Sequence, residues 1–184
     1  MTAIDLVSSE RSLVERARTG DRSAFGELAG RYQGPLAAFA MRWVDHAEEA
    51  QDAAQAALAD ALAALPGLAD PGAFKGWLYG IALNECRKRR RRAGRLRRAL
   101  AGLRGALAAR LAGAPAPSDV DGEAVRAAVA RLPERQRATV ELRIWEGLSC
   151  AEAAVALGCT EGTIKANFHH AMKKLRADLE EHDA

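Results

Sequence analysis

The segment between Ala47 and Leu65 constrains the fold most, because ten of its nineteen residues are alanine. Alanine is the strongest helix former and is depleted in β-strands. The segment ends at Pro66-Gly67, a typical stop signal for a helix. The same bias runs through the whole chain, which holds 42 alanines in 184 residues and only 5% aromatic residues. We therefore predict an all-α protein.

Glycine and proline divide the chain into two helical parts. We predict a small helical domain over residues 8–98, a flexible linker over 99–121 and a second small helical domain over 122–184. The linker ends in Gly113-Ala-Pro-Ala-Pro-Ser-Asp, a composition typical of flexible connections. In the first domain, apolar residues recur at helical spacing, with a break or kink expected at Gly34-Pro35.

The positive charge of the chain is concentrated in one short run. Nine of the twelve residues from Arg87 to Arg98 are Lys or Arg, and none is acidic. The remainder holds 18 basic and 24 acidic residues, a net charge of −6, although the whole chain carries +3. A block this dense in an otherwise acidic chain indicates binding to nucleic acid more than a solvated helix face. Membrane binding is less favoured because no bulky apolar face accompanies the block.

The strongest local signal for function lies near the C-terminus. Ser149-Cys-Ala-Glu152 matches a capping box that opens a short helix, and Gly158 falls in the turn that follows. Thr160 is placed to cap a second helix, over residues 161–181. This spacing predicts a helix-turn-helix unit, whose second helix reads bases in the major groove with its first turns. The candidate DNA-binding residues on that helix are Thr163, Lys165, Asn167, His169, His170, Lys173, Lys174 and Arg176.

The sequence contains no motif of a catalytic or cofactor site and no segment typical of a membrane span. It contains no glycine-rich phosphate loop, no GxSxG and no HExxH, so we predict neither an enzyme nor a cofactor. Cys86, Cys150 and Cys159 include no CxxC pair, and we expect small half-buried residues rather than a disulfide or a metal site. No apolar run approaches about 20 residues and no signal peptide is predicted, so the cytoplasm is the expected compartment.

Both parts resemble extracytoplasmic-function sigma factors, the smallest members of the main bacterial sigma family. The C-terminal part is similar to their region four in Leu132-Pro-Glu-Arg-Gln-Arg-Ala-Thr-Val-Glu-Leu-Arg143, Glu146-Gly-Leu-Ser149 and Leu157-Gly-Cys-Thr-Glu-Gly-Thr-Ile-Lys165. The N-terminal part is similar to region two in Asp21-Arg-Ser-Ala-Phe25, Asp52-Ala-Ala-Gln55 and Phe74-Lys-Gly-Trp-Leu-Tyr-Gly-Ile-Ala-Leu-Asn84. The resemblance implies a transcription initiation factor with three partners: core RNA polymerase, promoter DNA and an anti-sigma factor.

The resemblance also implies roles for particular residues. Phe74 and Asn84 match positions that capture or contact a flipped base of the −10 element. Trp77 matches a tryptophan that we interpret mainly as core, with DNA contact as the alternative. The −35 element would be read by Lys165, Asn167 and His170, among the candidates given above. The basic run would hold phosphates through Arg87, Lys88, Arg89, Arg90 and Arg91. Core polymerase would be contacted by Asp52 and Gln55.

Two departures from the family pattern leave alternatives open. Ala56 and Leu58 stand where the family usually has an acid and a large aromatic residue, which predicts a weaker or rearranged polymerase contact. One alternative is therefore a sigma-like interaction protein that titrates an anti-sigma factor. The other is a stand-alone helix-turn-helix regulator, which leaves the N-terminal motifs unexplained.

Overall fold

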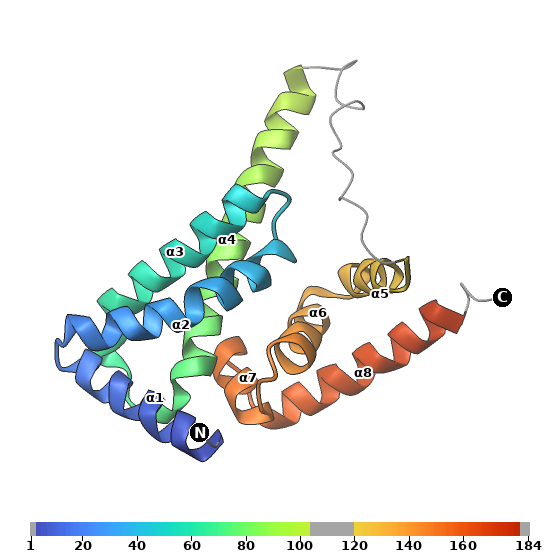
Figure 1. The fold of residues 1–184 in the computed structure, drawn as a ribbon. Coiled ribbons are helices and arrows are strands. Elements are labelled where there is room, and N and C mark those ends of the chain that lie inside the picture. The colour runs from blue at the N-terminus through green and yellow to red at the C-terminus, as the bar shows by residue number, and fades with distance from the viewer. Residues whose placement is uncertain (1–2, 104–119, 181–184) are drawn as a thin grey trace. The chain divides into compact units, whose positions relative to one another are not determined.

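The computed structural model describes residues 3–103 and 120–180, and these two ranges contain helices and turns but no β-strand (Figure 1). The chain divides into two compact units, residues 1–91 and residues 92–184. The predicted all-α fold is confirmed. Among the described residues, no helix combines the length and the apolar character that crossing a membrane requires.

The first unit is built on α1 (Ala3–Arg18), α2 (Arg22–Met41), α3 (Ala47–Ala64) and the beginning of α4 (Phe74–Leu103). Asp21 caps α2, because its carboxylate accepts hydrogen bonds from the backbone amides of Ser23 and Ala24 at 3.0 and 3.1 Å. Helix α2 packs against both α1 and α3. The buried face of α3 is mostly alanine, which lets α2 approach closely. These buried alanines are Ala50, Ala53, Ala54, Ala57 and Ala61.

Aromatic rings join α4 to α2. The ring of Tyr79 lies edge-on to Phe39, with centroids 5.4 Å apart, and Phe74 meets Tyr32 in the same way at 5.7 Å. The hydroxyl of Tyr32 donates a hydrogen bond of 2.8 Å to Glu10 of α1. Edge-to-face pairs add about 0.5–1.5 kcal/mol each beyond the area they bury. The rings therefore fix the first turns of α4 on the body of the unit.

Two details differ from the sequence-based expectation. Helix α2 is not broken at Gly34-Pro35 but continues to Met41. Both residues lie on its exposed side, where water can solvate the carbonyl group whose helical partner proline lacks. Helix α4 continues to Leu103, five residues into the predicted linker, because the alanine and leucine residues there favour a helix. The rest of that linker, 104–119, lies outside the described residues.

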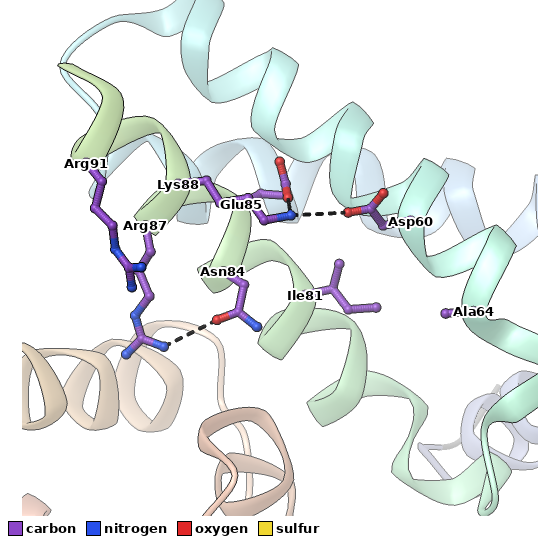
Figure 2. Close-up of a pocket in the computed structure, with 8 residues that line it drawn as sticks. All are labelled: Asp60, Ala64, Ile81, Asn84, Glu85, Arg87, Lys88 and Arg91. Atoms are coloured by element: carbon purple, nitrogen blue, oxygen red, sulfur yellow. Dashed lines mark hydrogen bonds and ion pairs between the residues drawn. The ribbon is translucent and has the colours of Figure 1, made fainter. Parts of the chain in front are cut away.

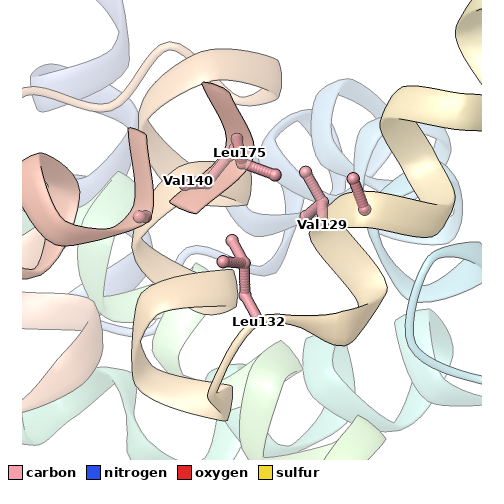
Figure 3. Packing of buried hydrophobic residues seen from close by; sticks show 6 residues of the cluster. Val129, Leu132, Val140 and Leu175 are labelled. Atoms are coloured by element: carbon pink, nitrogen blue, oxygen red, sulfur yellow. The ribbon is translucent and has the colours of Figure 1, made fainter. Parts of the chain in front are cut away.

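The second unit contains α5 (Val120–Arg131), α6 (Glu134–Val140), α7 (Cys150–Leu157) and α8 (Glu161–Glu180). A π-helical turn, Glu141–Trp145, continues α6. Helix α8 packs against α5, α6 and α7. Its contact with α5 and α6 is a cluster of buried hydrophobic side chains, which Figure 3 shows as sticks. The cluster consists of Ala128, Val129, Leu132, Val140, Ala171 and Leu175.

Candidate nucleic-acid and polymerase interfaces

Local hydrogen bonds form the predicted helix-turn-helix unit. The hydroxyl of Ser149 accepts from the amide of Glu152 at 3.2 Å, and the Glu152 carboxylate accepts from the amide of Ser149 at 2.7 Å. The capping box is therefore present. Gly158 ends α7 in the left-handed region with a φ of 59°, a conformation that favours glycine. The hydroxyl of Thr160 then accepts from the amide of Thr163 at 3.2 Å and opens α8.

Helix α8 divides cleanly into a buried and an outer side. Ile164, Ala171 and Leu175 are buried, and half-buried Phe168 packs against the cluster of Figure 3. Of the predicted DNA-binding residues on this helix, Lys165, His170, Lys173 and Lys174 are exposed, whereas Thr163 and Asn167 are half-buried. The outer side of the first turns therefore presents a mixture of cationic, amide and hydroxyl groups. These are the groups that hydrogen-bond base edges and phosphates.

Arg143, the last residue of the first region-four motif, holds the start of this unit in place. Its guanidinium donates a 2.5 Å hydrogen bond to the backbone carbonyl of Leu148, directly before the capping box. The same group lies 6.0 Å from the centre of the Phe168 ring. Arg143 thus touches both the turn before α7 and the inner side of α8.

Among the described residues, the histidines and cysteines form no metal-binding group. His169 and His170 are exposed, with ring centres 5.9 Å apart in an edge-on arrangement. Cys150 and Cys159 are half-buried, as expected, whereas Cys86 is fully buried, and all three thiols are free. In the described ranges, no group of three His, Cys, Asp or Glu residues is placed to hold a metal ion.

In the first unit, residues of α3 and α4 line an open pocket of about 350 Å³ (Figure 2). The side chain of Asn84 points toward Arg87, whose guanidinium lies 3.4 Å from its amide oxygen. Ile81 and Ala64 supply apolar contacts. The pocket therefore combines cations, apolar atoms and two carboxylates, those of Asp60 and Glu85. Its lining consists of Asp60, Ala64, Ile81, Asn84, Glu85, Arg87, Lys88 and Arg91.

A buried carboxylate lies beneath the basic run. Glu85 is only 7% exposed, and it accepts hydrogen bonds from Lys88 at 2.5 Å and from Arg89 at 2.7 Å. Burial alone raises the pKa of Glu85, but the bonds from Lys88 and Arg89 outweigh it and hold that pKa below its usual value. The hydrogen bond to Glu85 in turn raises the pKa of Lys88. Both partners therefore stay ionised at neutral pH.

The cations of the basic run therefore differ in their exposure and in their bonding partners. Arg89 is half-buried and also donates to the backbone carbonyl of Asp52 at 3.0 Å, so it joins α4 to α3. The guanidinium of Arg90 lies 5.5 Å from the centre of the Trp43 ring. Arg90 and Arg91 are exposed and Arg87 is half-buried. Of the predicted phosphate-binding residues, Lys88 and Arg89 are the two that Glu85 engages.

Phe74 does not lie where base stacking requires it. The side chain is 1% exposed, and its ring packs against Tyr32 and, with centres 6.0 Å apart, against Trp77. A base cannot reach this ring unless the core opens. Trp77 is half-buried beside it, which agrees with its interpretation as mainly a core residue. The expected contact between Phe74 and a flipped base is therefore not supported by the structure.

The predicted polymerase-binding residues share an exposed side of α3. Asp52 and Gln55 are both exposed and three residues apart, so they project from one side of the helix. Leu58, one of the two departures from the family pattern, is 9% exposed and belongs to the core. Ala56 is half-buried. Leucine in place of the family's large aromatic residue at position 58 therefore alters packing inside the unit more than the surface around Asp52.

Sequence reasoning missed Glu85 and Asp60. The signal for Glu85 was present, because an acid placed three and four residues before Lys88 and Arg89 on a helix can bond both. The carboxylate of Asp60 on α3 lies 3.9 Å from the ammonium group of Lys88 on α4. No local pattern could reveal that contact, since it depends on how the two helices pack.

Comparison with known proteins matches both units to one family. Residues 28–96 match the model of Sigma-70 region 2, and residues 122–175 match that of Sigma-70, region 4. The RNA polymerase sigma-H factor of Pseudomonas aeruginosa is 31% identical over 93% of this chain and 94% of its own length. The ECF RNA polymerase sigma-E factor of Escherichia coli is 30% identical over 91% of this chain and 92% of its own.

Solved structures agree with these matches. CnrH, in complex with the cytosolic domain of CnrY, superposes with a TM-score of 0.70 at 27% identity, over 94% of this chain and 98% of CnrH. The sigma factor RpoE of Bartonella quintana, in complex with the anti-sigma factor NepR, gives a TM-score of 0.65 at 27% identity. That match covers 85% of this chain and 96% of RpoE.

Proposed function

Because this chain belongs to the extracytoplasmic-function sigma factors, which direct core RNA polymerase to promoters, we propose that its two units divide promoter recognition between them. The second unit reads the −35 element through α8, and the first unit contacts the −10 element through the pocket between α3 and α4. Sigma factors are initiation factors, and we assign no catalytic step to this chain. Its place of action is the cytoplasm, where polymerase and promoter DNA meet.

The observation that carries this proposal is the division of α8. Its inner side is anchored in the core, while its first turns present side chains that suit base edges. Lys165 can donate to guanine O6 or N7, and Asn167 can pair with adenine N6 and N7. Lys173 and Lys174 lie about two turns further on, where phosphate contacts are expected. This is the layout of a recognition helix.

In the first unit, we propose that Asn84 contacts a base and that Arg87, Arg90 and Arg91 hold the backbone around it. Asn84 is exposed and lines the pocket, and an amide offers both a donor and an acceptor. We leave Phe74, Lys88 and Arg89 out of the DNA contact, because Phe74 is buried and Glu85 engages the two cations. Asp52 and Gln55 are proposed to contact core polymerase.

Replacement of Asn167 by alanine is expected to relax the preference at one −35 base pair. The best site should lose about 1–3 kcal/mol of binding free energy and mismatched sites less, because the bidentate pair is lost only where it forms. Lys173→Ala should weaken all sites by a similar factor. The measurement is the affinity of both holoenzymes for every single-base variant of the −35 element.

Lys174→Ala is the matched control, because it removes a second exposed lysine of α8 and should also act on all sites alike. A uniform loss across the variants for Asn167→Ala would make Asn167 a backbone contact. The register of α8 in the groove would then differ from the one proposed.

We further propose that an anti-sigma factor controls this chain. The support is the likeness to the RpoE structure, which was solved with an anti-sigma factor bound. In the titration alternative, such a partner would be the chain's main target and DNA contact would be dispensable. Purification of the chain from its native cell tests the partner, and finding the chain only free or bound to polymerase would reject it.

A further inference from the structure

The buried carboxylate of Glu85 uses both of its oxygens on cations of the basic run. One oxygen lies 2.5 Å from the Lys88 ammonium group, and the other lies 2.7 Å from the Arg89 guanidinium. The carboxylate side chain is 9% exposed, so water can do little to solvate it. A buried carboxylate that loses a partner pays a large desolvation penalty. The ion pair between Glu85 and Lys88 is therefore stabilised by the burial of Glu85, although the Lys88 side chain is 68% exposed.

Each of these cations also has a second partner on α3. The Lys88 ammonium group lies 3.9 Å from the carboxylate of Asp60, and Figure 2 shows Lys88 placed between the two acids. Arg89 donates to the backbone carbonyl of Asp52 at 3.0 Å. Both side chains are therefore directed toward α3. By contrast, the Arg87 side chain reaches toward Asn84 along the pocket wall.

We propose that Glu85 is a positioning residue that withholds Lys88 and Arg89 from the phosphates of promoter DNA. This inference rests on the proposed function, in which Asn84 and the neighbouring arginines meet DNA. Contacts between cations and phosphates add affinity for every sequence alike, whereas contacts to bases distinguish sequences. By engaging two of the nine cations in the run, Glu85 lowers binding that is independent of sequence and leaves base contacts a larger share of the affinity.

The test is the salt dependence of DNA binding by the complete holoenzyme, on promoter duplex and on duplex of unrelated sequence. Glu85→Gln keeps the size of the side chain but offers one acceptor oxygen instead of two, so Lys88 is released. The slope of log affinity against log salt should steepen by about 0.7–0.9, the value of one added phosphate contact. The ratio of promoter to unrelated affinity should fall.

Lys88→Gln supplies the decisive comparison. Alone it should leave the salt slope unchanged, because Lys88 contacts no phosphate while Glu85 holds it. Combined with Glu85→Gln, it should return the slope to the parent value. Glu15→Gln is the matched control, since Glu15 also bonds an arginine four residues away, at 3.3 Å, but on the exposed surface of α1.

Arg87→Gln distinguishes a failure of the proposed DNA contact of the first unit from a failure of the role proposed for Glu85. If Arg87→Gln lowers the slope by about 0.7–0.9 while Lys88→Gln lowers it equally, the first unit contacts DNA as proposed but Glu85 withholds nothing. If Arg87→Gln leaves the slope unchanged, the proposed DNA contact of the first unit fails, and the inference fails with it. Should Glu85→Gln not fold, the comparison of Lys88→Gln with Arg87→Gln still decides the question.

Discussion

Replacement of Phe74 by alanine is expected to lower the free energy of unfolding of the first unit by about 3–5 kcal/mol. The ring is 1% exposed and packs against Tyr32 and Trp77, so its removal leaves a cavity where α4 begins. Unfolding in urea, followed by circular dichroism, measures the loss. Because two units can unfold separately, the curve is analysed as two transitions.

The matched control for this prediction is Phe168→Ala in the second unit. Phe168 is half-buried against the cluster of Figure 3, and its loss should leave the transition of the first unit where it is. A loss below about 1 kcal/mol for Phe74→Ala, together with failure to open promoter DNA, would show that the ring works on a base rather than in the core.

The double replacement Asp52→Arg with Gln55→Ala is expected to weaken binding to core polymerase by about 1–3 kcal/mol, the scale for losing charged and polar anchors of an interface. Both side chains are exposed on one side of α3, and neither is needed for the packing of the unit. Titration of labelled core polymerase with the variant measures the affinity. The unfolding curve should stay close to that of the parent chain.

Glu27→Arg with Gln33→Ala makes the same chemical changes on the exposed side of α2 and should leave polymerase affinity unchanged. Equal losses for both double variants would indicate a general charge effect. Unchanged affinity for the α3 variant would move the polymerase interface away from Asp52 and Gln55.

Those parts of the fold that depend on neighbouring residues were predictable from the sequence. The end of α3, the capping box at Ser149 and the cap at Thr160 are set by hydrogen bonds and backbone preferences within a few residues. The continuation of α2 through Pro35 was not predictable from local preference, because it depends on which side of the helix faces water. The full length of α4 was not predictable from local preference either, because Gly102 lowers the helix propensity of its last residues.

The same distinction holds for the proposed site. The outer residues of α8 followed from helical spacing, since a helix with a fixed inner side has a fixed outer side. The role of Phe74 did not, because an aromatic residue at the start of a helix serves a core or a base equally well until its neighbours are known. The bond between Arg89 and the Asp52 carbonyl joins residues 37 positions apart, so only the packing of α3 on α4 reveals it.

Transcription by purified core polymerase on a library of genomic fragments, with and without this chain, tests the central claim most directly. The account predicts new start sites that depend on the chain and share one −10 and one −35 element. The Asp52→Arg with Gln55→Ala variant should lose all of these sites together. Transcripts that are the same with and without the chain, from a chain that still binds an anti-sigma factor or duplex DNA alone, would contradict the account.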